Sequence, residues 1–384
     1  MQVPVRLTLL LRPSVAPGAL LAVGYSTFVL GATPFLLDLV AEAYDVGLAA
    51  ASLIGVAQLG GFVVGSWGAG HWLTPRRRVF VATLVLAVTA NLGSALLPPF
   101  AVLVGLRLAS GLALGLIAWF VWSQVFGDQK GMGDIALMGP IAGLVASPAI
   151  AVVAARGGAD GVFWFLAALA SIPLVLNRGT GATGPAATRG PRSAPVPAAA
   201  VMLVALGLFT LGGSAVFQYA VVLGTGKPGL SIETVALVFS ANALASMPAT
   251  KWPWRRGIPG PWMAATALCA FGLATATVPV VFMASLALWG FAFWMAVPGV
   301  FTALAERSAN PADRAGDAQA IMAAGRVGGP FLGGVLIDRF GTTTLGFAAA
   351  GLMLCAAVAV FVVRNQAPPR ADSQLPTLTP SGSR

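Results

Sequence analysis

Apolar residues in this chain gather into long stretches that are separated by short polar segments. An α-helix needs about 20 consecutive apolar residues to cross the roughly 30 Å hydrocarbon core of a bilayer. We count twelve stretches of this kind, at residues 18–38, 47–70, 79–97, 100–126, 134–155, 161–177, 197–223, 233–250, 261–278, 280–304, 318–337 and 342–363. The pattern predicts an all-α integral membrane protein with twelve transmembrane helices.

The composition agrees with a bilayer environment and leaves little chemistry for an enzyme. The chain is 58% hydrophobic and 9% charged, whereas soluble domains carry roughly 25% charged residues. It has one His and two separate Cys, which lie within apolar stretches and favour packing over a disulfide or metal site. Metal or nucleophile chemistry needs clusters of such side chains. We therefore expect no enzymatic activity, no cofactor and no metal.

Basic residues alternate between the predicted loops. If the N-terminus is cytoplasmic, 17 of the 22 Lys and Arg residues fall on the cytoplasmic side, and Arg76, Arg77 and Arg78 form the densest cytoplasmic run. This bias is the positive-inside pattern of membrane proteins. It predicts a multi-pass protein of the plasma (inner) membrane with both termini cytoplasmic. The net charge of +10 then faces anionic lipid and implies no nucleic-acid partner.

A local motif repeats 182 positions apart, with Pro148 corresponding to Pro330. The first copy comprises Gly143, Ser147, Pro148 and Ala151, and the second comprises Gly325, Gly329, Pro330, Gly333 and Gly334. The repeat predicts two pseudo-symmetric six-helix bundles, as in many secondary transporters. We expect the bundles at residues 1–177 and 197–364, a cytoplasmic linker at 178–196 and a disordered cytoplasmic tail at 365–384. Small residues allow close helix contact and proline bends a helix, so both copies are expected to pack and gate.

The chain resembles the major facilitator superfamily, and most of all its twelve-helix drug:H+ antiporter branch. In the fourth stretch, Arg107, Gly111 and Gly115 are similar to the R-x-x-x-G-x-x-x-G signature of that family, and the repeated motif is similar to the branch's antiporter motif. The loop after the second stretch departs from the family because it lacks the usual Asp. The resemblance implies the family fold, alternating access, proton coupling and a monomer.

Few ionisable residues are predicted within the membrane, and each is therefore a functional candidate. Arg107 is about 10 Å deep in its helix. The resemblance makes Asp38, at the outer end of the first stretch, its natural partner. Protonation of Asp38 could release Arg107 as a coupling switch. A static ion pair and an unpaired Asp38 at the cavity mouth are the alternatives.

Arg326 stands where the first copy of the repeat has Leu144. It is expected either to extend toward Glu306, Asp313 and Asp317 in an ion pair or to bind an anionic group of a substrate. The helices that the family turns inward supply further candidates for a substrate cavity, namely Gln58, Trp119, Gln218, Tyr219, Asn242, Trp289 and Trp294. Trp289 and Trp294 are five positions apart, so at least one is expected to face lipid or to pack.

Together these features predict a secondary active transporter that exports small amphipathic or hydrophobic compounds in exchange for protons. A proton-independent facilitator or uptake transporter of a small organic solute is the alternative. The short loops leave no room for the recognition domain of a receptor. The absence of a carboxylate near the middle of any stretch favours neutral, zwitterionic or anionic substrates over cations.

Overall fold

The computed structural model describes residues 15–125, 129–177, 195–250, 258–307 and 311–365, and every regular element in these ranges is a helix. The elements are α2 (Pro17–Tyr44), α3 (Leu48–Ala51), α4 (Leu53–Trp72), α5 (Arg77–Ala95), α6 (Phe100–Val125), α7 (Gln129–Val175), α8 (Pro197–Phe217), α9 (Ala220–Thr225), α10 (Ile232–Thr250), α11 (Pro259–Thr275), α12 (Pro279–Glu306) and α13 (Pro311–Asn365).

Two of these helices are hairpins. α7 turns at Gly158, where φ is 60°, and α13 turns at Gly341, where φ is 81°. These backbone angles are open to glycine and costly for other residues. In the described residues nine helices are long and apolar enough to span a membrane. The second arms of α7 and α13 raise this number to eleven, and α11, 17 residues long, is the twelfth. The chain is thus an all-α, multi-pass membrane protein, as predicted.

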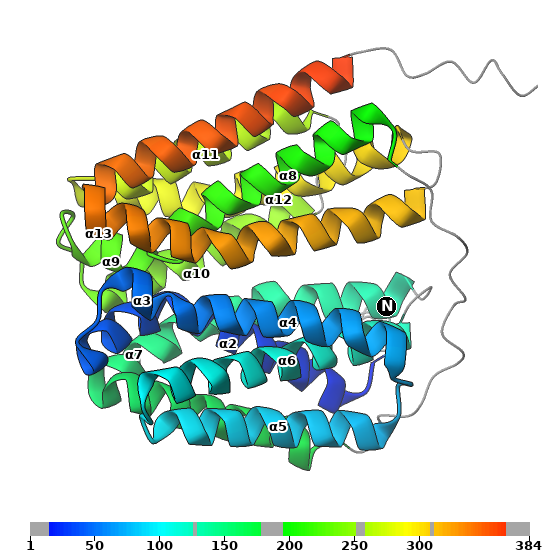
Figure 1. Ribbon diagram of the computed structural model, residues 1–384, viewed down its shortest axis with the longest axis vertical. Helices are drawn as coiled ribbons and strands as arrows, with labels where there is room; N and C mark the ends of the chain where they lie inside the picture. The colour runs from blue at the N-terminus through cyan, green and yellow to red at the C-terminus, as the bar shows by residue number, and fades with distance from the viewer. Residues whose placement is uncertain (1–14, 126–128, 178–194, 251–257, 308–310, 366–384) are drawn as a thin grey trace, which may run out of the picture.

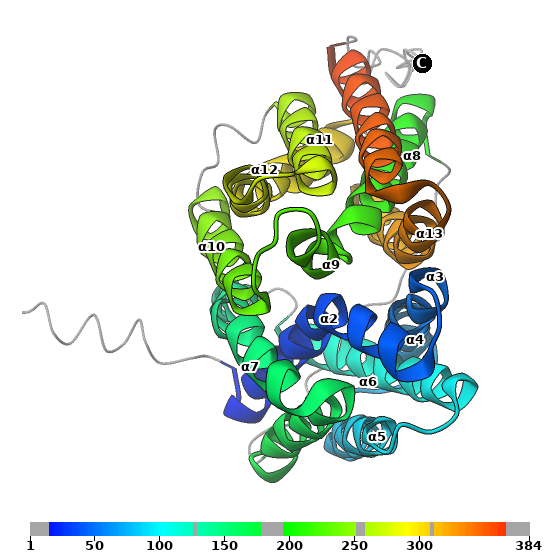
Figure 2. The same cartoon turned by 90° about the vertical axis from the view of Figure 1, so that its left-hand side faces the viewer.

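The helices form two bundles that lie side by side (Figures 1 and 2). α2 to α7 pack against one another, and α8 to α13 form the second bundle. The turns at Gly158 and Gly341 stand 183 positions apart, close to the spacing of the sequence repeat. Most of the predicted linker and tail, at residues 178–194 and 366–384, lies outside the described residues, so the predicted boundaries stay predictions.

Two predicted spans are interrupted. The stretch at 47–70 divides into α3 and α4 at Ser52, and the stretch at 197–223 divides into α8 and α9 at Gln218 and Tyr219. The Tyr219 N–H still bonds to the Val216 carbonyl at 3.0 Å, so the chain keeps a helical turn while it changes direction. This break lies where the bundles meet. It changes the direction of the Gln218 and Tyr219 side chains from the one that a continuous helix would give them.

The two sides of the bundle pair differ in how tightly they close. We call the side where α7 ends and α8 begins the linker side, and the other the α3 side. On the α3 side the backbone N–H of Ala49 donates to Asp338 Oδ2 at 2.9 Å. The Tyr219 hydroxyl, 2.7 Å from the Pro330 carbonyl, also lies 3.4 Å from the Leu48 carbonyl of the other bundle. The ribbons of α4 and α13 lie together here and diverge toward the linker side (Figure 1).

Glycines set the closest helix contacts within each bundle. A Cβ at Gly111 of α6 would lie 1.8 Å from the Gln58 carbonyl oxygen of α4, and one at Gly115 would lie 2.2 Å from that of Phe62. In the second bundle, Gly325, Gly329 and Gly333 of α13 face the backbone of α8 in the same way. These α4–α6 and α8–α13 contacts leave no room for a side chain.

The two copies of the repeat differ in this respect. Gly143 and Ser147 of the first copy line the space between the bundles, with Pro148 one position further along α7. A Cβ at Gly143 would find its nearest neighbour, the Ala243 side chain, at 3.7 Å, which is ordinary van der Waals contact. The tight packing predicted for both copies therefore holds at the second copy only.

Candidate functional site

A cavity with two adjoining lobes lies between the bundles near the middle of the helices. The lobes have volumes of about 330 and 250 Å³, and they share Phe217, Gln218, Asn242 and Arg326 as lining residues. The first volume lies at the lower end of the range for small-molecule sites, roughly 300–1,000 Å³, and the second lies just below it. Such a cavity is large enough for a small organic molecule.

The first lobe is bounded by both bundles. Its remaining lining residues come from α2, α4, α7 and α10, and they are Thr27, Leu30, Gly31, Thr33, Pro34, Leu59, Gly143, Ala146, Ser147, Phe239 and Ala243. The second lobe extends into the C-terminal bundle between α8 and α12, where it is lined by Thr210, Gly213, Ser214, Trp289, Gly290, Phe293 and Trp294. The first lobe thus combines aliphatic and polar side chains, and the second has more aromatic side chains than the first.

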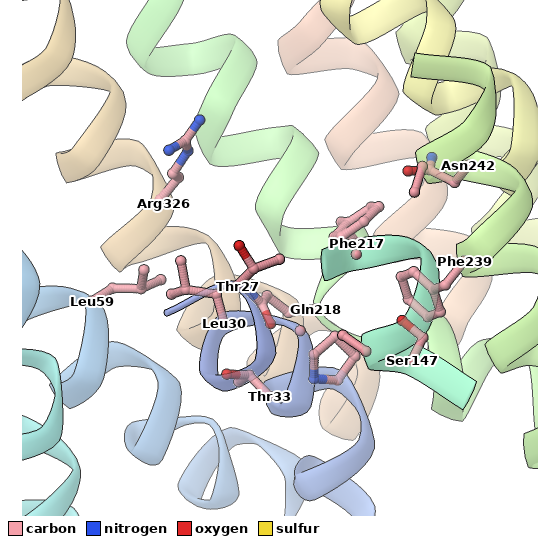
Figure 3. Close-up of a pocket in the computed structure, with 15 residues that line it drawn as sticks. Thr27, Leu30, Thr33, Leu59, Ser147, Phe217, Gln218, Phe239, Asn242 and Arg326 are labelled. Atoms are coloured by element: carbon pink, nitrogen blue, oxygen red, sulfur yellow. The ribbon is translucent and has the colours of Figure 1, made fainter. Parts of the chain in front are cut away.

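Arg326 supplies the positive charge of the cavity. It projects from α13 into the space that Asn242 of α10 borders from the opposite side (Figure 3). Its side chain is exposed to the cavity although it lies deep between the helices. It makes neither a hydrogen bond nor an ion pair with any described residue, so the ion pair predicted with Glu306 or Asp317 is absent, while the side chain of Asp313 lies outside the described part of the chain. The guanidinium borders the cavity instead of extending to those carboxylates.

Two amides add polar groups to this apolar space. The Gln218 carbonyl oxygen is buried and has no hydrogen-bond partner. The Asn242 amide nitrogen donates to the Leu286 carbonyl at 2.7 Å, which fixes the orientation of that side chain. A ligand in the cavity can therefore meet fixed hydrogen-bonding groups as well as a cation.

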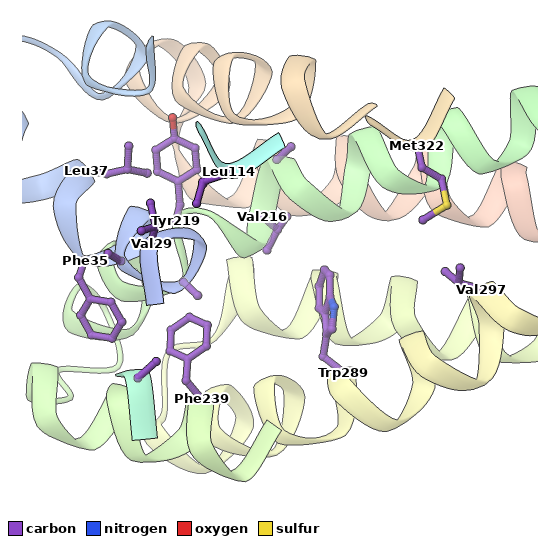
Figure 4. Close-up of a cluster of buried hydrophobic side chains, with 14 of the residues drawn as sticks. Val29, Phe35, Leu37, Leu114, Val216, Tyr219, Phe239, Trp289, Val297 and Met322 are labelled. Carbon is purple, nitrogen blue, oxygen red and sulfur yellow. The ribbon is translucent and has the colours of Figure 1, made fainter. Parts of the chain in front are cut away.

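Several predicted cavity residues lie elsewhere. Tyr219 is fully buried among the side chains drawn in Figure 4 and closes the α3 side, because the break after α8 turns it away from the cavity. Gln58 is buried, and its amide nitrogen reaches the Thr33 hydroxyl at 3.4 Å and the Val29 carbonyl at 3.5 Å. Trp119 packs against the core of its own bundle. None of the three lines either lobe.

Trp289 and Trp294 both border the second lobe, and Trp289 also packs in the hydrophobic core, in line with the expectation that at least one of them packs or faces lipid. Trp289 is only 5% exposed and lies 5.5 Å from the Phe217 ring, whereas Trp294 is 42% exposed. Gly290 and Phe293, which lie between them in α12, line the same lobe. The second lobe is wide enough that side chains from two faces of α12 border it.

Arg107 does not face the cavity but lies in a polar cluster inside the N-terminal bundle. Its Nη2 donates to the Ser94 hydroxyl at 2.7 Å and to the Ala90 carbonyl and Asn91 Oδ1 at 3.1 Å each. Its guanidinium carbon also lies 4.7 Å above the Phe163 ring, a cation–π arrangement. The predicted contact with Asp38 is absent, since Asp38 is exposed and neutral groups of α5 surround Arg107.

Asn91 holds this cluster together, and sequence reasoning missed it. Besides accepting from Arg107, its amide nitrogen donates to the Tyr25 hydroxyl and to the Ala87 carbonyl at 2.8 Å each. It therefore links α2, α5 and α6. The Arg107 Nε and Nη1 atoms are buried without partners, which makes the remaining bonds costly to lose. The signal available in the sequence was that Asn91 is a polar residue within the third apolar stretch.

Replacement of Asn91 by leucine is expected to lower the free energy of unfolding by about 3 kcal/mol, because a buried cation loses a partner. The corresponding drop in melting temperature would be measured on the purified protein in detergent. Thr89→Val is the matched control, since Thr89 is exposed on the same helix and bonds within it. Equal melting temperatures for Asn91→Leu and the control would show that the cluster contributes nothing to stability.

Solved structures resemble this chain in fold across most of its length. The nucleoside transporter NupG (D323A mutant) has a TM-score of 0.69 at 14% identity, covering 90% of this chain and 98% of its own. A bacterial homologue of the human lysosomal transporter Spinster, inward-facing and unoccupied, has 0.66 at 12% identity, with 95% and 96% covered. The human organic anion transporter MFSD10 (TETRAN) has 0.64 at 15%, with 89% and 97% covered. No protein-family model and no curated protein matches the sequence.

The chain has the major facilitator superfamily fold. In this fold the cavity between the two six-helix bundles is the place where a ligand can reach both halves. These similar structures are of transporters rather than enzymes. Arg326, Gln218 and Asn242 occupy that central position here. The candidate functional site of this chain is therefore the central cavity, and Arg107 belongs to the frame that supports it.

Proposed function

We propose that this protein is a secondary transporter that carries a small organic molecule across the membrane by alternating access. The observation that carries the proposal is a central cavity between two bundles that meet tightly on one side, through Ala49, Asp338 and Tyr219. Transport follows if these contacts open while the opposite side closes. The basic residues Arg76, Arg77 and Arg78 lie at the linker side and support its assignment as cytoplasmic. The structure then corresponds to an inward-facing state.

The similar structures support a small organic substrate without fixing it. They include a nucleoside transporter and an organic anion transporter. A D-xylose-proton symporter, with a TM-score of 0.63 at 14% identity, shares the fold and couples its solute to protons. We therefore include proton coupling in the proposal. We favour export in exchange for protons because the repeated motif around Pro148 and Pro330 resembles the antiporter motif. A proton-independent facilitator is the alternative, favoured by the absence of a carboxylate among the described lining residues.

The test is movement of small fluorescent amphipathic compounds of negative, neutral and positive charge in proteoliposomes that hold the purified protein. We expect a pH gradient to drive at least one compound at a rate well above that of protein-free liposomes. Equal rates with and without the gradient would favour the facilitator. Rates equal to those of empty liposomes for every compound would contradict transport of this class.

Asp338→Asn is expected to lower the gradient-driven rate about tenfold, whereas Asp38→Asn should leave it within about twofold. Both side chains are exposed, but only Asp338 joins the bundles, through the Ala49 N–H, while Asp38 is outside that contact. An amide keeps a hydrogen-bond acceptor but neither the charge nor the exchangeable proton. The initial rate of each variant under the same gradient measures the effect. A normal rate for Asp338→Asn together with a large loss for Asp38→Asn would restore the coupling site predicted from the sequence.

A further inference from the structure

The cavity holds a cation whose charge no described residue balances. Arg326 lines both lobes and has no hydrogen bond or ion pair. An arginine remains charged in proteins, and a charge away from bulk water is costly unless it is paired. Since no carboxylate borders either lobe among the described residues, water or a ligand must provide the partner.

The walls around this cation are aromatic. Phe217 borders both lobes, its ring centroid lies 5.5 Å from that of Trp289 and 5.4 Å from that of Phe239, and Phe293 borders the second lobe. Figure 3 shows Phe217 between Arg326 and Asn242. Inorganic anions gain nothing from such surfaces, whereas an apolar ring or chain gains from contact with them.

We propose that the central cavity selects amphipathic organic anions, namely compounds with one carboxylate or sulfonate group attached to an aromatic or alicyclic body. The acid group pairs with the Arg326 guanidinium, whose planar array of N–H donors matches two oxygens of one acid. The apolar body lies against Phe217, Trp289 and Phe293. This inference deepens the proposed transport function and rests on it for its biological meaning.

A polar group without a partner in the shared wall narrows the choice of ligand further. The Gln218 carbonyl oxygen is buried and unpartnered in the wall that both lobes share. A ligand with a hydroxyl or amide N–H on its body can satisfy it, and leaving it unpaired reduces the gain from binding. Cations are disfavoured, because a second positive charge near Arg326 is repelled more strongly here than in water. The preferred ligand therefore carries an acid at one end and a hydrogen-bond donor on its apolar body.

The experiment measures binding to the purified protein in lipid nanodiscs, with empty nanodiscs subtracted. The probes are 1-naphthylacetate, its neutral analogue 1-naphthylacetamide and the cation 2-(1-naphthyl)ethylammonium, which share one ring system. We expect the acetate to bind about 10- to 100-fold more tightly than the amide, as for hydrogen bonds to a charged group, and the cation to bind most weakly. Similar affinities for the acetate and the amide in the wild-type protein would overturn the proposal without any variant.

Variants assign the preference to one side chain. Arg326→Gln is expected to remove the preference for the acetate, and Arg326→Lys to retain part of it, since lysine keeps the charge but not the planar array of donors. Arg156→Gln is the matched control, because Arg156 is exposed on α7 and lines neither lobe. If Arg326→Gln melts like the wild type yet keeps the full preference, Arg326 is not the anion site. If Arg326→Gln does not fold, a preference that is reduced in part or in full in a folded Arg326→Lys supports the proposal, and a preference equal to the wild type opposes it.

The same probes separate the two proposals. Charge-selective binding without movement of 1-naphthylacetate across proteoliposome membranes would contradict transport and leave the anion site standing. Movement of all three probes at equal rates would support transport and overturn the anion preference.

Discussion

Gly334→Val is expected to open the α3 side of the protein and to expose the central cavity from that side. A Cβ at Gly334 would lie 2.6 Å from both the Ala49 Cα and the Tyr219 hydroxyl oxygen. Real Cβ atoms do not approach backbone atoms this closely, so the bundles must separate where they meet. Strain of about 3 kcal/mol is typical of overpacking and changes a two-state equilibrium on the order of 100-fold. The valine therefore disfavours the closed α3 side.

The measurement is labelling of a cysteine at position 30 with a membrane-impermeant maleimide. Leu30 is 37% exposed and lines the first lobe, and the native Cys269 and Cys355 would first be replaced. With Gly334 intact, we expect labelling in inside-out vesicles and little in intact cells, whereas Gly334→Val should be labelled in intact cells. Gly351→Val is the control, because nothing lies within 4 Å of a Cβ there. Unchanged labelling in Gly334→Val would show that this contact does not control access.

Gly111→Val is expected to destabilise the N-terminal bundle rather than to shift it between states. A Cβ at this position would meet the backbone of Gln58 at 1.8, 2.6 and 2.8 Å, and α4 cannot move away without breaking the neighbouring Gly61 and Gly115 contacts. The change combines overpacking with loss of close helix contact, and we expect a cost of about 3 kcal/mol or more. Since most proteins are stable by only about 5–15 kcal/mol, this loss is large.

Thermal melting of the detergent-purified variants and their yield from membranes measure the effect. Gly111→Val should melt about 10 °C lower than the wild type. Gly105→Val lies on the same helix, where a Cβ meets nothing within 4 Å, and should melt like the wild type. Equal melting of the two variants would mean that α4 and α6 do not depend on this glycine contact.

The helices could be predicted from hydropathy because the bilayer imposes a length on each apolar stretch. All twelve predicted stretches correspond to spans, including the two hairpins whose turns fall at Gly158 and Gly341. The breaks at Ser52 and at Gln218 and Tyr219 could not be predicted. They depend on how the two bundles meet, and the apolar pattern continues across them without a change.

The site was predicted in part, because a buried charge can be recognised in a sequence but its partner cannot. Arg107 and Arg326 were singled out by their depth. The structure surrounds Arg107 with neutral groups of α5 and leaves Arg326 in the cavity, so neither makes the ion pair that was one of the expectations for each. Asp338 was overlooked, since it lies at the end of a stretch, and only the folded chain brings it to Ala49, 289 positions away.

The Asp338 contact can be compared with an acidic residue that the loop after the second stretch lacks. The loop after the second stretch lacks the Asp that is usual in the family that the chain resembles. The acidic contact between the bundles lies instead on the α3 side, where Asp338 accepts from the Ala49 N–H. Among the described residues, this contact and the Tyr219 hydroxyl bring the two bundles together on the α3 side.

Distance measurements by double electron–electron resonance would test alternating access most directly. One spin-label pair, at positions 96 and 278, would span the bundles on the α3 side, and a second pair, at 73 and 258, would span them on the linker side. Leu96, Val278, Leu73 and Ile258 are all exposed. We predict that 1-naphthylacetate lengthens the first distance and shortens the second in part of the population. Two distances that stay constant, or that change in the same direction, would contradict transport by alternating access.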